Sequence, residues 1–224
     1  MKRLILPFFI ILFLSPVSFA VAALPIGVRC PVPPKSQGKL NLIFFSFYKK
    51  SSNIGFYIPQ NLVLLDSLYT EDKAKCLTAQ TYQAFVLMYD ALLRDTGQRL
   101  VVGSAWRSTQ TQSYFARVRG EFAAPPGRSE HQLGVAVDLA ISGSKEGELF
   151  GDSVVYQWMK EHAAEYGFVQ SFTIEDALTT GSPAEPWHWR FVGTTIASRL
   201  KIENRNINEF LYQRTEAKKK GLSY

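Results

Sequence analysis

The sequence contains few cysteines and histidines, the residue types that most zinc sites require. It has two cysteines and three histidines among 224 residues, and it contains no internal repeat or low-complexity segment. Neither Cys30 nor Cys76 has another Cys or a His at ligand spacing, which argues against a thiolate zinc site. No nucleic-acid-binding motif accompanies the formal net charge of +6, so we expect no nucleic-acid partner.

Long apolar runs are also scarce, and the clearest one lies at the start of the chain. Lys2 and Arg3 precede an apolar run over residues 4–13, and small residues follow. This pattern is typical of a secretory signal peptide, which we place at residues 1–22. The run is short for a membrane span, so we expect membrane contact only if the signal stays uncleaved. The prediction is an exported protein, periplasmic or extracellular.

The remaining residues, about 202, suit a single domain. We expect an irregular, proline-containing arm over residues 23–52, one folded domain over residues 53–215 and a basic tail over residues 216–224. The mature chain keeps 23 basic and 19 acidic residues, and this mild excess predicts only a weak attraction to anionic surfaces. We expect a monomer.

Export bears on the two cysteines, because thiols present in even number are usually oxidised outside the cytosol. We predict a disulfide between Cys30 and Cys76, which would tie the arm to the start of the first helix. Two free thiols are the alternative.

Hydrophobic periodicity predicts a mixture of helices and short strands. Thr78 is a good N-cap and Gly97 a good stop for a first helix, and Ser108 is well placed to cap a second. Strands are predicted at residues 56–65, 99–105, 133–141, 168–172 and 187–192, and helices at 78–97, 109–119, 153–166, 194–201 and 207–214.

Residues 129–138, which read SEHQLGVAVD, form the most informative stretch. Gly134, Ala136 and Asp138 alternate with apolar residues, so we expect them to share one face of a strand. That face has little bulk and ends in a carboxylate, and an imidazole at His131 lies just upstream. The arrangement suits a small bound ion.

A second cluster, EPWHWRF over residues 185–191, contributes His188 and Glu185. Two imidazoles and the carboxylate of Asp138 resemble a catalytic zinc site that keeps its fourth position open. Glu185 could then serve a bound water as base and later as acid. Residues three apart on a flat strand face opposite sides, so Glu185 and His188 can converge only if Pro186 marks a bend.

These two stretches resemble the signature motifs of the zinc D-alanyl-D-alanine carboxypeptidase family (VanY-like, LAS-type metallopeptidases). Further similar pieces are the YxP segment at 57–59, the element at 104–108, a helix ending in Tyr-Gly-Phe, and EPWHWRFVG. The resemblance implies that His131, Asp138 and His188 are zinc ligands and that Glu185 is the catalytic base. It also implies an α+β, Hedgehog/DD-peptidase-like fold with a small, mostly antiparallel central sheet flanked by helices.

The resemblance extends to the substrate. It implies that Arg107 engages the carbonyl or terminal carboxylate of a peptide and that Gln112 and Ser129 line the same pocket. A guanidinium is chemically suited to either role. The sequence departs from the usual family pattern at Trp106, where Tyr is common, and at residues 169–172, where an Arg-Tyr-containing stretch is usual.

The resulting hypothesis is a hydrolase with a Zn²⁺ cofactor, associated with the cell wall. Residues 53–215 would be a carboxypeptidase domain that removes the terminal D-alanine from peptidoglycan stem peptides. The alternatives are an L,D-carboxypeptidase acting on tetrapeptide stems and a non-catalytic wall-binding module. Glu185 argues against the last, because a purely structural metal site does not need a carboxylate beside an open ligand position.

Overall fold

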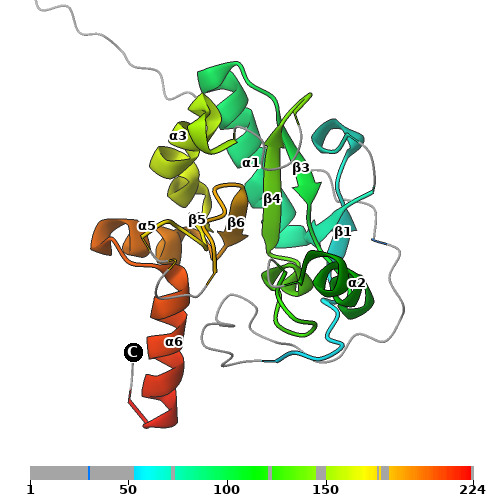
Figure 1. Ribbon diagram of the computed structural model, residues 1–224. Coiled ribbons are helices and arrows are strands. Elements are labelled where there is room, and N and C mark those ends of the chain that lie inside the picture. Colours follow the sequence, from blue (N-terminus) through cyan, green and yellow to red (C-terminus); the bar gives the residue numbers. More distant parts are fainter. Residues whose placement is uncertain are drawn as a thin grey trace, which may run out of the picture.

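The computed structural model describes residues 30, 53–71, 74–120, 123–144, 150–175, 177 and 182–222 (Figure 1). The predicted signal peptide at 1–22 lies outside the described residues, and so does the predicted arm at 23–52 except for Cys30. In the part of the chain that is described, no helix combines the length and the hydropathy of a membrane span.

A four-stranded antiparallel sheet forms the centre of the molecule. Its strands lie in the order β3 (Leu100–Ser104), β4 (Ala136–Ile141), β6 (His188–Phe191) and β5 (Phe168–Gln170). Two further strands, β1 (Leu62–Leu64) and β2 (Cys76–Thr78), make a separate antiparallel pair. The predicted small antiparallel sheet is therefore confirmed.

Helices surround the sheet, and their ends follow the capping residues in the sequence. The α-helices are α1 (Ala79–Thr96), α2 (Thr109–Arg119), α3 (Val154–His162), α5 (Thr194–Glu203) and α6 (Ile207–Lys219), and the 3-10 helices are η3 (Ser67–Tyr69), η5 (Glu130–Leu133), η6 (Phe150–Asp152) and η7 (Ala163–Tyr166). The side chains of Thr78, Ser108 and Ser153 accept hydrogen bonds from the first turns of α1, α2 and α3. Gly97 ends α1 in the left-handed conformation that glycine adopts without a Cβ clash.

One face of the sheet is covered by α1 and α3, which lie side by side in Figure 1. Val137, Leu139 and Trp189 point into this interface and pack with Phe85 and Met88 of α1 in one buried cluster. The alternation of residues along a strand sends Asp138 and His188 to the opposite face. The apolar face thus gives rigidity to strands whose other face carries polar side chains.

The predicted strand at 133–141 is wrong at its start. Glu130–Leu133 form the 3-10 turn η5, and Gly134 ends that turn with φ +70°. A Cβ on Gly134 would lie 2.9 Å from a methyl carbon of Leu62. Gly134 is therefore required by a left-handed turn and by close packing against β1, not to clear space on the face that carries Asp138.

Three other elements differ more clearly from the prediction. The helix predicted at 207–214 continues to Lys219, so the first residues of the predicted tail at 216–224 are helical. An ion pair between Glu216 and Lys219 supports this extension. The helix predicted to reach residue 166 instead tightens into η7 before Gly167. The strand predicted at 56–65 is reduced to β1, since Pro59 lies outside its hydrogen-bonded part.

Cys30 and Cys76 form a disulfide with a Cα–Cα distance of 6.0 Å. Cys76 is the first residue of β2, and the backbone N–H of Cys30 donates to the carbonyl of Leu62 in β1. The cross-link therefore joins Cys30 to the strand pair that leads into α1.

Replacing both cysteines with Ser should lower the free energy of unfolding by about 2–4 kcal/mol. The reason is that the bond closes a loop between residues 46 positions apart and so restricts the unfolded chain. Urea unfolding of the double variant and of the wild type, each with and without a reducing agent, measures the effect. If the oxidised wild type and the double variant unfold at the same urea concentration, the cross-link does not stabilise the domain.

Candidate metal and catalytic site

The sheet itself brings two of the predicted ligands together. β4 and β6 are antiparallel, and Asp138 is the cross-strand partner of His188. Side chains of directly opposed residues lie on the same face of a sheet. Two residues that are 50 positions apart in sequence are therefore neighbours on the polar face.

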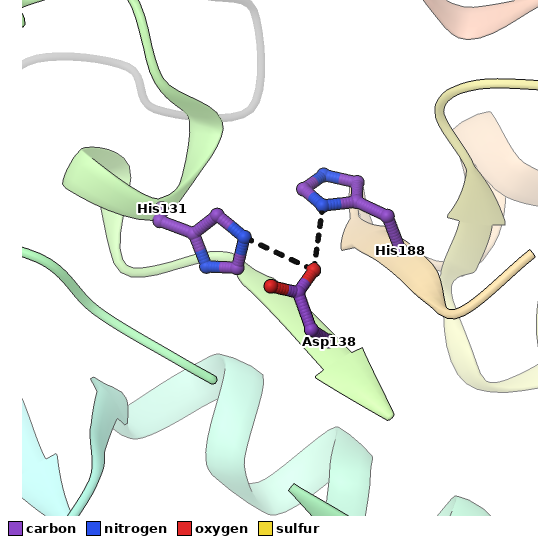
Figure 2. Close-up of side chains that lie close together, drawn as sticks. All are labelled: His131, Asp138 and His188. Carbon is purple, nitrogen blue, oxygen red and sulfur yellow. Dashed lines mark hydrogen bonds and ion pairs between the residues drawn. The ribbon is translucent and has the colours of Figure 1, made fainter. Parts of the chain in front are cut away.

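The third predicted ligand, His131, comes from η5 (Figure 2). The carbonyl of His131 accepts a hydrogen bond from the backbone N–H of Arg107, and its ring Nδ1 lies 2.8 Å from the carbonyl oxygen of Ala105. These contacts fix η5 against the segment that follows β3. His131, Asp138 and His188 are all buried, and each offers one ligand atom within 4.8 Å of the others.

The contacts of His131 show that the three residues suit a cation. A carbonyl can only accept, so Nδ1 of His131 donates to Ala105 and carries the proton. Burial, together with the nearby charge of Arg107, lowers the pKa of His131 to about 4, which keeps the ring neutral near pH 7. Its unprotonated Nε2 then faces the carboxylate oxygen Oδ1 of Asp138 at 3.1 Å. Two acceptors at this distance are the expected ligands of a positive ion.

The imidazole of His188 is fixed at both nitrogens. Nδ1 lies 2.9 Å from Oδ1 of Asp138, and Nε2 lies 2.9 Å from Oε2 of Glu130. Burial alone would lower the pKa of His188, but the hydrogen bonds to Asp138 and Glu130 outweigh it and raise the pKa to about 10. His188 thus presents Nδ1 to the other two ligands, and Nε2 points away from them.

Glu185 reaches the same place through a turn. The backbone N–H of His188 donates to the carbonyl of Glu185 at 3.0 Å, which closes a turn with Pro186 and Trp187 at its centre. The predicted bend at Pro186 is therefore present, and Oε2 of Glu185 lies 3.6 Å from Nδ1 of His188. Burial raises the pKa of the Glu185 carboxyl. The side chain of Glu185 is 22% exposed, more than that of any of the three ligands.

Arg107 lies at the edge of the same cluster. Its Nη2 atom is 3.8 Å from Oδ2 of Asp138, and its guanidinium carbon is 5.0 Å from the ring centre of Phe115 on α2. The aromatic ring holds the planar group in place through a cation–π contact. The structure thus brings together Arg107, Glu185 and the three predicted ligands.

The two remaining predicted pocket residues lie in different surroundings. Ser129 is the N-cap of η5, two positions before His131, and its hydroxyl makes no capping hydrogen bond. Gln112 is buried in α2, where its amide donates to the carbonyl of Ala124 at 2.6 Å. Gln112 forms no hydrogen bond with the three ligand residues, so its observed contact is with the loop before η5.

Three residues around the site were not predicted from the sequence. Glu130, Ser171 and Arg190 are all buried, and each hydrogen-bonds within a network that reaches His188. The sequence could have indicated Arg190, because this residue lies two positions after His188 on β6 and its side chain is therefore on the same face of the sheet. Glu130 adjoins His131, but nothing in the local pattern predicted which way its side chain points.

Comparisons with known proteins agree with this geometry. The family model for VanY, described as D-alanyl-D-alanine carboxypeptidase, matches residues 74–194. The putative carboxypeptidase YodJ of Bacillus subtilis (strain 168) is 29% identical over 170 residues, which cover 70% of this chain and 62% of that protein. A D-alanyl-D-alanine carboxypeptidase of Enterococcus faecalis (strain ATCC 700802 / V583) is 30% identical over 142 residues, which cover 55% and 51% of the two chains.

Solved structures show the same fold. The LdcB LD-carboxypeptidase superposes with a TM-score of 0.66 at 25% identity, covering 76% of this chain and 95% of that one. VanYB in complex with D-alanine-D-alanine gives a TM-score of 0.61 at 24% identity, covering 75% and 97%. The chain spans only about half to three-fifths of the length of the two curated relatives. The family match nevertheless covers more than half of the chain and contains every predicted ligand, and the chain therefore belongs to the VanY family of D-alanyl-D-alanine carboxypeptidases.

Proposed function

We propose that this protein is an exported, zinc-dependent D,D-carboxypeptidase that removes the terminal D-alanine from peptidoglycan stem peptides. The observation that carries the proposal is the buried cluster of His131, Asp138 and His188 beside the carboxylate of Glu185, in a chain of the VanY family. Two imidazoles and one carboxylate form a ligand set typical of catalytic zinc, with a position left for water or substrate.

The proposed chemistry divides between the metal and Glu185. Zinc held by His131, Asp138 and His188 would supply a water of lowered pKa and polarise the scissile carbonyl. The carboxylate of Glu185 accepts the proton that the attacking water loses and then donates it to the nitrogen of the departing D-alanine. The peptide C–N bond breaks, and the products are a shortened stem peptide and free D-alanine.

Arg107 suits the recognition of the substrate's end. A guanidinium donates from several N–H groups in one plane, which matches a terminal carboxylate or the charge that develops on the carbonyl oxygen. Its contact with Phe115 and its distance from Asp138 place these donors next to the ligands. Arg107 therefore has both the chemistry and the position to orient a C-terminal residue.

Replacing Arg107 with Ala should lower kcat/KM for D-alanine release by about 10²–10³-fold, as expected for the loss of a donor to developing oxygen charge. Arg107→Lys should restore only part of the rate, because an ammonium keeps the charge and loses the planar fork. Steady-state kinetics on a stem pentapeptide give the values. Arg117→Ala is the matched control, since Arg117 stacks on Tyr114 of the same helix. Equal rates for the Arg107→Ala variant and the wild type would exclude a role in substrate binding.

One assay tests the proposed function directly. Purified protein with zinc is incubated separately with stem tripeptide, tetrapeptide and pentapeptide, and the products are identified by mass spectrometry. We expect the loss of one alanine from the pentapeptide and its suppression by a chelator. Loss of alanine only from the tetrapeptide would instead establish L,D-carboxypeptidase activity. This alternative is tested because the fold is similar to that of the LdcB LD-carboxypeptidase. Absence of turnover on all three peptides would favour a non-catalytic wall-binding module.

Export is part of the proposal. The basic and apolar pattern over residues 1–22 supports it, and so does the disulfide between Cys30 and Cys76, a bond that persists in oxidising compartments. Fractionation of cells that produce the full chain should find the protein outside the cytoplasm. A protein retained in the cytoplasm with reduced cysteines would contradict this part of the proposal.

A further inference from the structure

We propose that Glu130 is a positioning residue that orients His188 for zinc, and that Ser171 and Arg190 hold Glu130 in place. The inference deepens the proposed function and rests on it, because it takes the metal to be zinc. It assigns a role to a buried carboxylate that is neither a ligand nor the catalytic base.

Glu130 makes three short polar contacts in a buried environment. Its Oε2 atom accepts from Nε2 of His188 at 2.9 Å and from the hydroxyl of Ser171 at 2.6 Å. Its Oε1 atom accepts from Nη1 of Arg190 at 2.6 Å. The side chain of Glu130 is only 3% exposed. Both carboxylate oxygens are therefore occupied, and the group has one available orientation.

The contact with His188 fixes the ring for metal binding. A carboxylate can only accept, so Glu130 holds a proton on Nε2, and a metal bound beside Asp138 would take the place of the proton on Nδ1. Nδ1 is also the nitrogen that faces Asp138. A carboxylate behind a ligand imidazole sets its tautomer, restrains its rotation and makes it a stronger donor to the metal. Glu130 is placed to do all three.

Arg190 and Ser171 hold the carboxylate of Glu130 in position through hydrogen bonds. Arg190 is 0% exposed, and a buried guanidinium requires a nearby anion, which Glu130 provides. Ser171 is also fully buried, and its backbone carbonyl accepts from the side-chain amide of Asn208 at 2.8 Å. Asn208 belongs to α6, so the C-terminal helix is connected to the histidine ligand through Ser171 and Glu130.

Ser171 follows β5 directly and is neither a ligand nor the catalytic base. Its hydroxyl donates directly to the carboxylate behind His188. Ser171 is therefore a position at which this chain can adjust metal affinity without altering a ligand.

The test measures zinc affinity rather than activity. The zinc dissociation constants of the wild type, Glu130→Gln, Ser171→Ala and Ser153→Ala are determined by competition with a chromophoric chelator. Gln keeps the length of Glu and removes its charge and one acceptor oxygen. Ser153→Ala is the control, because it removes a hydrogen-bonded serine hydroxyl at the start of α3, away from the ligands. We expect zinc affinity to fall about 10–100-fold in Glu130→Gln, less in Ser171→Ala and not at all in Ser153→Ala.

Nitrogen-15 NMR of the zinc-bound protein adds a structural readout. In the wild type the His188 proton should reside on Nε2, and in Glu130→Gln it should exchange faster with solvent. A folded Glu130→Gln variant that binds zinc within threefold of the wild type would overturn the inference. If Glu130→Gln does not fold, equal zinc affinities for Ser171→Ala and Ser153→Ala would overturn it, and a selective loss in Ser171→Ala would support it. A wild type that binds no zinc would refute the proposed function as well, so the two failures are distinguishable.

Discussion

Glu185→Gln should lower kcat/KM for D-alanine release by about 10²–10⁴-fold while zinc stays bound. The size follows from the usual contribution of a positioned general acid–base group. Zinc should stay bound because Glu185 lies outside the buried set of His131, Asp138 and His188 and approaches Nδ1 of His188 only to 3.6 Å. Single-turnover release of D-alanine and metal content after gel filtration measure the two effects. Glu161→Gln, at an exposed site on α3, is the control.

The pH dependence gives a second signature of Glu185. The base acts only as the carboxylate, so it requires that Glu185 be ionised. The rate should therefore rise with pH as Glu185 ionises, and this acid limb should be missing from the residual activity of Glu185→Gln. An unchanged acid limb in the variant would assign the titration to another group and would exclude Glu185 as the base.

Stability should change in the opposite direction to activity. A carboxyl whose pKa is raised on folding contributes stability at low pH, and this contribution is lost as pH rises through the folded-state pKa. At pH 7 and in the presence of a chelator, ionised Glu185 thus costs stability, and Glu185→Gln should unfold at the same temperature as the wild type or a higher one. A lower unfolding temperature would mean that lost activity partly reflects lost structure.

The ligands could be predicted from the sequence because each belongs to a short, regular pattern. Asp138 follows an apolar alternation that indicates a strand, and Glu185 and His188 flank a proline that indicates a turn. The resemblance of both stretches to one family joined them into a single site. Side chains that act within a few residues of a recognisable motif are therefore accessible to sequence analysis.

The residues that hydrogen-bond behind the ligands could not be predicted from the sequence in this way. Glu130 contacts Ser171, His188 and Arg190, which lie 41 to 60 positions later in the chain. These contacts depend on the register between β4 and β6 and on the close approach of β5, and no local period specifies either. The start of β4 was missed for a related reason, since the φ of Gly134 is set by packing against Leu62.

Among these variants, Asp138→Asn should lower zinc affinity most, because one carboxylate oxygen of Asp138 lies close to a ring nitrogen of both histidines. Oδ1 lies 3.1 Å from Nε2 of His131 and 2.9 Å from Nδ1 of His188. Burial would raise the pKa of Asp138, but the adjacent imidazoles keep it well below its usual value, so the group is ionised at neutral pH. Asn preserves the shape and removes the charge. Zinc affinity should fall by more than about 100-fold. The loss of a residue that only hydrogen-bonds to a ligand already lowers metal affinity by about 10–100-fold, and the loss of a ligand's charge should lower it further.

Competition with a chelator measures that affinity, and activity at increasing zinc concentration separates lost binding from lost chemistry. Activity that recovers as zinc is added would show that Asp138 acts by holding the metal, which is the expected result. Asp90→Asn, at an exposed position of α1, should leave both measurements unchanged. The metal-free Asp138→Asn variant should also be less stable than the wild type, because Arg107 and His188 lose their shared buried anion. If Asp138→Asn bound zinc as tightly as the wild type, the charge of Asp138 would not hold the metal, and the proposed set of three ligands would be wrong.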